Sequence, residues 1–362
     1  MALSSSRWMA ALADSTQMTS VSIPGAHDAC CYELTGVTEQ LLKSKWAPLF
    51  AVAAALPLAG IVGLTAAEYV VRVLAQTQAL DLRQQLAAGV RFFDVRPSFG
   101  ENRALPIYHG IVRTRITLAV VLAEITKFLD QNRSEYVVLR IKAENDEVSR
   151  YRRMEMLEDC LAPHANFIST HNPYARTPVS AVRGKMILLV QDIDALRHPL
   201  QSQNWSYASV QDQYEINVNE NFISTLADGA CRIGTAPIKT VLSLFGKKTG
   251  NWCENVGKNV PKIFVPDKVF NAKRLAIKNH HSLAIARSDE NFSNFSINFV
   301  SCVGSGSDIL LLSPQLCADK FNPGIKQLIA GSGNGDRAGI IVMDFITEDL
   351  AKGIYLSNKL TS

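Results

Sequence analysis

Ionisable side chains follow short apolar runs at four places in this sequence, where a strand would just have ended. They are His27 with Asp28, Asp94 with Arg96, His109 in the stretch IYHG, and Lys142 in the stretch RIKAEN. If these positions meet in space, the set suits phosphoryl transfer, because one histidine can take a proton from an attacking hydroxyl while the other gives one to the leaving oxygen. The arginine would neutralise charge growing on the phosphate oxygens, and the carboxylates would orient the imidazoles and stabilise their cations.

The same residues also permit a structural interpretation. A histidine behind a strand is structural more often than catalytic, and Asp94 with Arg96 could form a simple salt bridge. Further histidines lie in polar stretches that are typical of loops, and we assign them no role: His164, His171, His198, His280 and His281. The helices and strands that position the ionisable residues therefore help to decide between a catalytic and a structural role.

Short apolar runs alternate along the chain with stretches of helical periodicity. The runs that predict buried strands are 21–23, 89–95, 136–141, 185–190 and 339–345. The stretches 80–88 and 117–129 predict amphipathic helices between them. This alternation predicts an α/β fold with a parallel sheet, and in a parallel barrel the active site forms at the carboxyl ends of the strands. A tight turn at Pro24-Gly25 would then deliver His27 to the mouth of the barrel.

The composition is that of a folded protein with a large core. The chain has 362 residues, of which 47% are hydrophobic, and this suits one large domain or two ordinary ones. It carries 37 basic and 33 acidic side chains, a net charge of +4. So weak a positive charge does not indicate nucleic-acid binding, although it is compatible with an anionic membrane surface. The seven cysteines include no C-x-x-C pair, so neither a disulfide framework nor a zinc site is expected.

Residues 47–67 do not fit a simple α/β barrel, because they form a long apolar segment without a single charge. The segment is long enough to cross a bilayer as one helix. However, His27 lies before it and Asp94 lies after it, so a chain that places both in one barrel must return to the side that it left. A proline and two glycines divide the segment near its middle, and each half would measure about 15 Å as a helix, about half of a bilayer core.

We therefore predict a helical hairpin in this segment. It would dip into one leaflet of a membrane, or alternatively pack against the barrel or a second subunit. The lysine and tryptophan side chains at its start suit a lipid headgroup region. In the membrane interpretation, the side chains expected to contact lipid are Trp46, Leu49, Phe50, Leu56, Ile61 and Leu64.

Seven stretches of the chain form an ordered series of motifs. They are SIPGAHDA, QTQALDLRQQLAAGVRFFDVR, YHG, SEYVVLRIKAEND, RGKMILLVQD, VQDQY and GIIVMDFI. This series resembles that of the bacterial phosphatidylinositol-specific phospholipases C, the PI-PLC X-domain family. The likeness runs from near Trp8 to near Ile346, with poor matching over 224–292. It implies an irregular TIM barrel, a single catalytic domain over residues 1–362 in which 35–74 form an apolar helical insertion.

The resemblance also implies an activity, the cleavage of phosphatidylinositol into diacylglycerol and a cyclic inositol phosphate. His27 matches the general base on the inositol 2-hydroxyl, and Asp344 matches the carboxylate that orients this base. His109 matches the general acid, and Asp94 its partner. Arg96 matches the arginine that binds the phosphate.

Other positions match the inositol pocket of the family. Lys142, Asp212 and Tyr214 are the matches, and Tyr214 would stack its ring on the sugar face. The bacterial enzymes have an arginine after the RGK strand where this chain has Gln191, which donates fewer and weaker hydrogen bonds, so the preferred headgroup is left open. Asp28 either touches the reacting phosphate through Arg96 or only caps its loop.

The resemblance also bears on whether the protein needs a metal ion. Calcium-dependent relatives carry carboxylates where this chain has Arg96 and Lys142. These cations cannot ligate Ca²⁺, which takes oxygen donors, but they can do part of its electrostatic work. We therefore predict an enzyme that uses no metal and no other cofactor.

Two rival interpretations stay open. A glycerophosphodiesterase or a sphingomyelinase D on a similar barrel would hold magnesium with carboxylates, which Arg96 disfavours. A catalytically inactive lipid-binding protein, or a domain in which these residues form a buried ion network, is the other rival. Such a protein would have no chemical need to keep His27, His109 and Asp344 together with Asp94 and Arg96.

The predicted partners are phosphatidylinositol or a related inositol lipid and a membrane surface, with no nucleic acid and with the oligomeric state left open. The start of the chain has no apolar run before a small-residue cleavage site, so no secretory signal peptide is predicted. The sequence is compatible with a bacterial protein that is secreted, injected as an effector or retained in the cytosol.

Overall fold

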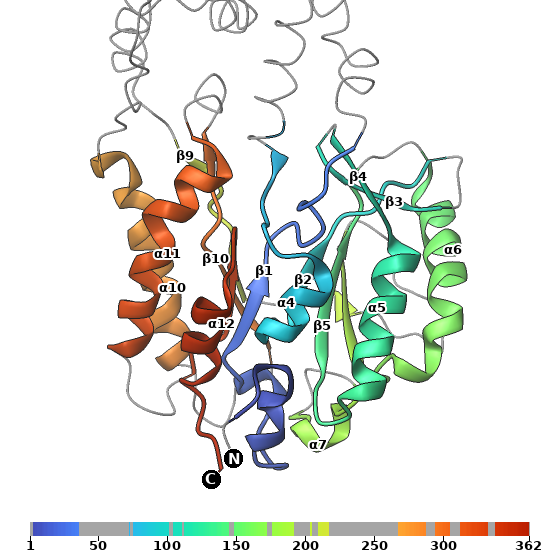
Figure 1. Cartoon of the computed structure of the whole chain (residues 1–362), viewed down its shortest axis with the longest axis horizontal. Helices are drawn as coiled ribbons and strands as arrows, with labels where there is room; N and C mark the ends of the chain where they lie inside the picture. The colour runs from blue at the N-terminus through green and yellow to red at the C-terminus, as the bar shows by residue number, and fades with distance from the viewer. Residues whose placement is uncertain are drawn as a thin grey trace, which may run out of the picture.

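One curled sheet of eight parallel strands forms the centre of the molecule (Figure 1). The computed structural model describes residues 3–35, 72, 75–100, 104–110, 112–144, 148–171, 176–191, 203–204, 209–216, 267–286, 294–304, 312–331 and 337–361. The strand order is β7-β6-β5-β2-β1-β12-β10-β8, and every ladder in this sheet is parallel. Within the described residues no ladder joins the edge strands β7 and β8, so the described sheet is an open, irregular barrel. The predicted parallel α/β architecture is confirmed.

The strands of this sheet are short. Their bounds are β1 Ile23–Ala26, β2 Phe92–Val95, β5 Val137–Lys142, β6 Met186–Gln191, β7 Gln203–Asn204, β8 Ser209–Gln211, β10 Ser296–Phe299 and β12 Ile340–Met343. Two small ladders accompany them: an antiparallel hairpin of β3 Pro106–His109 and β4 Val112–Thr117, and a parallel pair of β9 Glu215–Ile216 and β11 Val303–Gly304.

Helices surround the sheet (Figure 1). The α-helices are α4 Leu82–Ala88, α5 Leu118–Gln131, α6 Arg150–Leu161, α7 Val179–Val182, α10 Asn271–Ala286, α11 Pro314–Ala330 and α12 Glu348–Tyr355. Short 3₁₀ helices occur at η1 Ser5–Ala11, η2 Met18–Ser20, η3 Ala162–Phe167 and η5 Asp267–Phe270. Helix η1 and both chain ends lie at the amino ends of the strands (Figure 1).

Side chains alternate between the two faces of each strand, as the period of two requires. Outer-face residues such as Phe93 and Leu139 pack with α4 and α5 in one hydrophobic core. Inner-face residues form a second core, which Trp8 and Met9 of η1 close at the amino end. The strand residues of this inner core are Ile23, Phe92, Val138, Ile187, Leu189, Ile297, Phe299, Ile340 and Val342.

The same alternation gathers polar side chains at the carboxyl ends of the strands. Each of these side chains lies an even number of residues after an inner-core residue of its strand: His27, Asp94, Arg140, Gln191 and Asp344. The inner face is thus apolar at one end and ionisable at the other. The sheet alone brings these residues into one layer, at the end where parallel α/β barrels place their active sites.

The start of β1 differs from the prediction, because Pro24 and Gly25 belong to the strand and do not form a turn. The residues before the strand form η2, so β1 starts at Ile23 and not at the predicted position 21. A proline is tolerated because β1 pairs with β2 only from Gly25 opposite Phe92, and the missing N–H precedes that ladder.

Gly25 allows β1 to lie close to both of its neighbours. A Cβ at this position would lie 3.0 Å from Cδ1 of Phe92 and 3.2 Å from the carbonyl oxygen of Ile341. The glycine in the stretch IPGAHD therefore serves close strand packing beneath His27, and not a turn.

The other predicted strands and helices are found with shifted ends. Strands 136–141, 185–190 and 339–345 correspond to β5, β6 and β12, and helices 80–88 and 117–129 correspond to α4 and α5. Strand 89–95 is shortened to β2, because Gly89 adopts a φ of 103° and ends α4, with its N–H directed to the carbonyls of Gln85 and Leu86.

The predicted apolar hairpin at 47–67 lies outside the described residues. The same holds for its expected lipid-contacting side chains, which are Trp46, Leu49, Phe50, Leu56, Ile61 and Leu64. Within the described parts of the chain, no helix combines the length and the apolar character that crossing a bilayer requires.

Candidate active site

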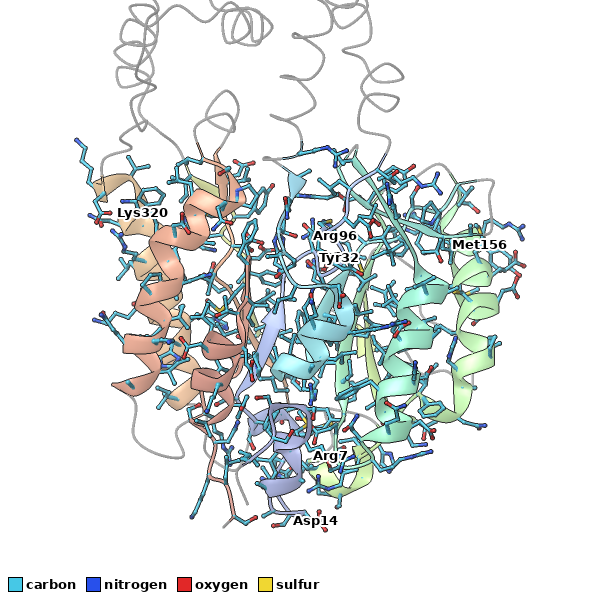
Figure 2. The ribbon with its side chains drawn as sticks, in the orientation of Figure 1. Arg7, Asp14, Tyr32, Arg96, Met156 and Lys320 are labelled. Atoms are coloured by element: carbon cyan, nitrogen blue, oxygen red, sulfur yellow. The ribbon has the colours of Figure 1, made fainter. Side chains whose placement is uncertain are left out.

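The carboxyl ends of the strands bring the predicted catalytic residues together. Figure 2 shows Arg96 at this end of the barrel and Arg7 and Asp14 at the opposite end. Five of the six predicted residues lie in or directly after central strands, namely His27 and Asp28 after β1, Asp94 in β2, Arg96 after β2, and Asp344 after β12. The sixth, His109, is the last residue of β3 in the hairpin.

His27 is held through one ring nitrogen and presents the other. Its Nδ1–H donates to Oδ1 of Asp344 at 2.7 Å, and its Nε2 accepts from Nη2 of Arg96 at 2.8 Å. Burial lowers the pKa of His27 well below its usual value, and the Arg96 guanidinium lowers it further. The imidazole is therefore neutral at pH 7, with a lone pair on Nε2. Burial raises the pKa of Asp344 well above its usual range, and the charge of Asp28 raises it further.

Gln78 fixes the two strand ends that carry this pair, and the sequence reasoning missed it. Its side chain is fully buried, and Nε2 donates to the carbonyl oxygens of His27 at 2.8 Å and Met343 at 2.9 Å. The only signal in the sequence is a polar residue inside the stretch QTQAL. Because one amide ties both carbonyls, it sets the separation of β1 and β12 where His27 meets Asp344.

Arg96 lies among carboxylates. Its Nε is 2.7 Å from Oδ1 of Asp28, its Nη2 donates to Oδ2 of Asp94 at 2.9 Å, and its Nη1 is 3.9 Å from Oε2 of Glu144. The side chain is only 13% exposed. A planar guanidinium held in this way has a fixed orientation, which suits it to receive a phosphate.

Asp28 lies between the two histidines. Its Oδ2 is 3.3 Å from Nε2 of His27 and 3.4 Å from Nε2 of His109. Its backbone has a φ of 39°, which turns the chain sharply after β1 and directs the carboxylate inward. Burial raises the pKa of Asp28 to about 6, although Arg96 and His109 act in the opposite direction. The ion pair of Asp28 with Arg96 is present, and a contact with the reacting phosphate through Arg96 stays a prediction.

The resemblance implied Asp94 as the partner of His109. In the structure, the carboxylate that faces His109 is that of Asp28. Asp94 instead pairs with two arginines, Arg96 and Arg140. His109 donates Nδ1–H to the carbonyl oxygen of Ala75 at 2.9 Å, which leaves Nε2 as the nitrogen that exchanges a proton. The rings of His27 and His109 lie 6.4 Å apart between centroids.

Arg140 is a second guanidinium of the site that the sequence reasoning missed. Its Nη1 lies 3.0 Å from Oδ1 of Asp94, and its Nη2 donates to Oε1 of Gln191 at 2.5 Å. Burial raises the pKa of Asp94, but Arg140 and Arg96 outweigh burial and hold it below its usual value. The sequence feature that could have indicated Arg140 is a charged residue inside the apolar run VVLRIK, two positions before Lys142.

Phe299 forms the apolar floor beneath these charges. Its ring packs edge-on against His27 with 5.9 Å between centroids, and the Arg140 guanidinium lies 5.3 Å from its centroid. The ring therefore restricts the movement of the imidazole. Sequence reasoning could not assign it, because the strand that carries it was not predicted.

The predicted pocket residues lie at the ends of neighbouring strands. Lys142 and Gln191 are the last residues of β5 and β6 and are paired in register, both half-buried. Asp212 and Tyr214 follow β8, and Tyr214 is 53% exposed. Gln191 is oriented by Arg140, so a guanidinium does reach this position, although it comes from β5.

Comparison with known proteins finds phosphodiesterases. The family described as phosphatidylinositol-specific phospholipase C, X domain, matches residues 63–191. The 1-phosphatidylinositol phosphodiesterase of Listeria monocytogenes is 31% identical over 188 residues, which make up 51% of this chain and 49% of that protein. The protein of the same name from Staphylococcus aureus strain Newman is 23% identical over 369 residues, 97% of this chain and 94% of that protein.

A solved structure extends the likeness to the whole fold. The phosphatidylinositol-specific phospholipase C from Listeria monocytogenes superposes with a TM-score of 0.66 at 21% identity, covering 98% of this chain and 99% of that one. The chain therefore has the fold of the bacterial phosphatidylinositol-specific phospholipases C, and residues 63–191 of it match the X-domain family. The predicted irregular TIM barrel is confirmed at the level of the fold.

Among the residues that the structure describes, one group of side chains has the spacing of a metal site. Ligand atoms of His27, Asp28 and Asp94 all lie within 4.8 Å of one another. However, Arg96 pairs with both carboxylates of that group. The chain itself thus supplies a positive charge between the oxygens that a hard cation would need.

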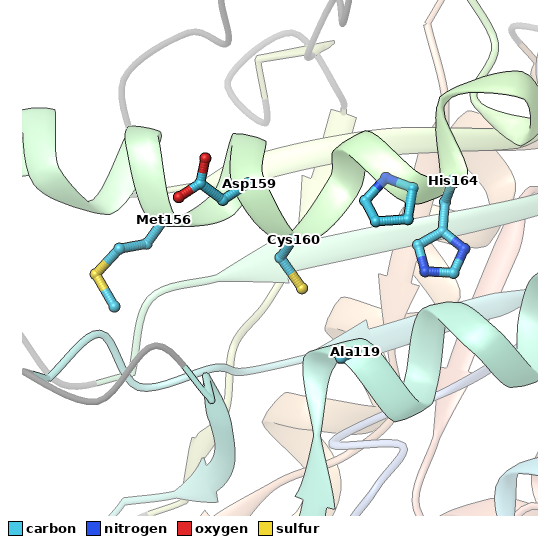
Figure 3. A pocket seen from close by; sticks show the side chains of 6 residues that line it. Ala119, Met156, Asp159, Cys160 and His164 are labelled. Carbon is cyan, nitrogen blue, oxygen red and sulfur yellow. The ribbon is translucent and has the colours of Figure 1, made fainter.

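Other candidate positions of this chain lie away from the strand ends. Figure 3 shows a pocket between α5, α6 and η3, lined by Ala119, Met156, Asp159, Cys160, Pro163 and His164. It is on the flank of the barrel, where Figure 2 labels Met156. His280 and His281 are buried in α10 and do not lie in a loop as expected, and His280 pairs with Ser296. His198 lies outside the described residues.

Proposed function

We propose that this chain is a metal-independent phosphatidylinositol-specific phospholipase C, which forms diacylglycerol and inositol 1,2-cyclic phosphate. The observation that carries the proposal is the His27 imidazole, held by Asp344 through Nδ1 and in contact with Arg96 through Nε2. A base and a phosphate-binding cation in contact are what an attack by a neighbouring hydroxyl on a phosphodiester needs. Relatives named 1-phosphatidylinositol phosphodiesterase support the same substrate.

In the proposed first step, His27 Nε2 removes the proton from the inositol 2-hydroxyl, and that oxygen attacks phosphorus. The bond from phosphorus to the diacylglycerol oxygen breaks, and His109 gives its Nε2 proton to this oxygen. A phosphate oxygen that accepts the Arg96 N–H would release the lone pair of His27, since Arg96 donates to it directly. Phosphate binding and activation of the base are thereby coupled. In a second step water attacks the cyclic phosphate, and the bond from phosphorus to the inositol 2-oxygen breaks. His109 takes the proton of the water, and His27 returns its proton to the 2-oxygen.

The carboxylates divide their work in this scheme. Asp344 orients His27 and stabilises the imidazolium that forms when His27 takes the proton. Asp28 does the same for His109, whose Nε2 it faces. Asp94 holds Arg96 in place and is itself neutralised by Arg140.

The headgroup would bind beside this centre, over the ends of β5, β6 and β8. Lys142 and Gln191 offer an ammonium and an amide to the inositol hydroxyls, and Asp212 offers a carboxylate. Tyr214 would cover the sugar with its exposed ring. These roles rest on the resemblance and on the position of the residues at one end of the sheet.

We further propose that the enzyme works at a membrane surface, since its substrate is a lipid. One solved relative from Staphylococcus aureus is described in terms of its membrane binding, which supports this setting. An export route and a lipid contact by residues 47–67 stay predictions.

Mixed vesicles of phosphatidylcholine and phosphatidylinositol test the activity and the metal requirement together. With EGTA and EDTA present, phosphorus NMR should show a cyclic inositol phosphate signal, because Arg96 supplies the positive charge at the phosphate. Vesicles of phosphatidylcholine alone serve as the control. Cleavage only after addition of calcium or magnesium would contradict metal independence, and intact phosphatidylinositol under all conditions would contradict the function.

The His109→Ala variant should distinguish the contribution of the general acid from that of the other catalytic residues. We expect cleavage of phosphatidylinositol to fall by about 10³-fold, whereas a nitrophenyl inositol phosphate should lose less than about tenfold, because a phenolate of low pKa leaves without a proton. Initial rates on both substrates at one pH give the two ratios. Equal losses on both substrates would argue against His109 as the acid.

A further inference from the structure

His109 is held by the bond from its own ring to the carbonyl oxygen of Ala75 and by hydrogen bonds of the residues on either side of it along the chain. Tyr108 N–H donates to the carbonyl oxygen of Arg96 at 3.0 Å, one residue before the imidazole. Gly110 N–H donates to Oε1 of Glu144 at 2.7 Å, one residue after it. The first bond belongs to backbone pairing, while the second depends on a side chain that the proposed mechanism does not use.

Glu144 is itself anchored beside the phosphate-binding arginine. Its backbone N–H donates to the carbonyl oxygen of Pro97 at 3.1 Å, which extends the pairing of β2 and β5 beyond both strands. Its carboxylate is only 11% exposed, and Oε2 lies 3.9 Å from Nη1 of Arg96. The two oxygens of one carboxylate therefore face the phosphate-binding arginine and the hairpin that carries the acid.

The contact with Gly110 is the stronger of the two. A hydrogen bond of 2.7 Å from an amide to a carboxylate is charge-assisted, whereas an ion pair at 3.9 Å is long. Gly110 has a φ of 57°, and glycine leaves such a conformation more easily than other residues do when no partner holds it. Removal of the acceptor would therefore loosen the end of β3, where His109 is the last residue and pairs with Val112 of β4.

We propose that Glu144 is a positioning residue for the general acid. Through its hydrogen bond with the Gly110 amide, Glu144 holds His109 at a fixed distance from Arg96 and His27. The proposal rests on the proposed function, in which His109 protonates the leaving oxygen. A shift of about 1 Å in such a group can cost about 10²-fold in rate. The loss would appear only on substrates whose leaving group needs the proton.

Three variants test this assignment. Glu144→Ala removes the acceptor, and Glu144→Gln keeps an oxygen that can accept from Gly110. Glu33→Ala is the matched control, because Glu33 also contacts the hairpin, through an exposed ion pair with Arg115 of β4. Initial rates are measured on phosphatidylinositol and on the nitrophenyl analogue, and the Gly110 amide is followed by ¹H–¹⁵N NMR as a readout independent of activity.

The expected pattern is specific. Glu144→Ala should lower the rate on phosphatidylinositol by about tenfold to hundredfold and the rate on the nitrophenyl analogue by less than about threefold. Glu144→Gln should recover most of the rate on phosphatidylinositol that Glu144→Ala loses. Glu33→Ala should leave the ratio of the two rates unchanged. The Gly110 resonance should move upfield in Glu144→Ala, and its amide should exchange faster.

Other outcomes would overturn the assignment. Equal losses on both substrates would mean that Glu144 acts through Arg96 or through the fold, and an unchanged Gly110 resonance would mean that the contact does not hold the hairpin. If Glu144→Ala does not fold, Glu144→Gln carries the test, and a rate ratio unchanged while its Gly110 amide shifts would refute the proposal. A wild-type protein that cleaves neither substrate would refute the proposed function, and the assignment with it.

Discussion

His27→Ala is expected to lower the cleavage of phosphatidylinositol by about 10⁴-fold, the upper range for removal of a general base. The reason is that Asp28 is already engaged with Arg96, and Asp94 with Arg96 and Arg140. The third carboxylate beside His27, that of Asp344, faces Nδ1 and not the nitrogen that takes the proton. The loss should be equally large on the nitrophenyl analogue, since removal of the proton from the 2-hydroxyl precedes departure of any leaving group. Phosphorus NMR of the vesicle reaction measures the first loss, and absorbance measures the second.

The pH profile provides a second test of the same role. Because burial and Arg96 lower the pKa of His27, the neutral imidazole persists below pH 6.5, and kcat/KM should fall only at more acidic pH. Asp344→Asn serves as the matched control, since it keeps an oxygen for the His27 Nδ1–H but removes the charge. It should retain more activity than His27→Ala. A His27→Ala variant with folded-state circular dichroism and more than about a tenth of wild-type activity would rule out His27 as the base.

Arg96→Ala should be the second most damaging change, with a loss of about 10³-fold in kcat. Arg96 is the group that contacts the base and also pairs with Asp28 and Asp94. Its removal would leave Asp28 buried without its main cation, so the pKa of Asp28 would rise further above its usual value. Asp94 would keep Arg140, so only part of the charge network is lost.

The substrate dependence distinguishes this loss from that of the acid. Charge grows on the phosphate oxygens whatever the leaving group, so Arg96→Ala should impair cleavage of phosphatidylinositol and of the nitrophenyl analogue alike. Arg96→Lys should recover little, because an ammonium cannot pair with two carboxylates through a fixed fork. Arg115→Ala, which removes an exposed arginine of the hairpin, is the control for a general effect of charge. A defect confined to phosphatidylinositol would contradict the role of Arg96 at the phosphate.

The central strands could be predicted because each of them is marked by a pattern of neighbouring residues in the sequence. The runs that became β2, β5, β6 and β12 are apolar and short, and the ionisable residues behind them stand at even spacings from inner-core positions. The meeting of His27 with Asp344 is different, because the two residues lie far apart along the chain. Their contact depends on the parallel register of β1 with β12, which no local pattern contains.

The errors have equally specific causes. Pro24-Gly25 has the composition of a turn, but Gly25 is required by the close approach of β2 and β12. The partner of His109 could not be chosen from sequence, since it depends on how the hairpin folds over the strand ends. Lys273 is a further case: it is fully buried, and its ammonium donates to the carbonyls of Gln213 and Phe299, in a helix that the sequence did not predict.

Both chain ends lie at the pole of the barrel opposite to the catalytic layer (Figure 1). They are tied together there, because Thr361 N–H donates to the carbonyl oxygen of Ala11 at 2.7 Å. A linker, a fluorophore or a solid support attached to either end would therefore project away from the substrate. An immobilised form of the enzyme could then present its catalytic pole to lipid vesicles in one defined orientation.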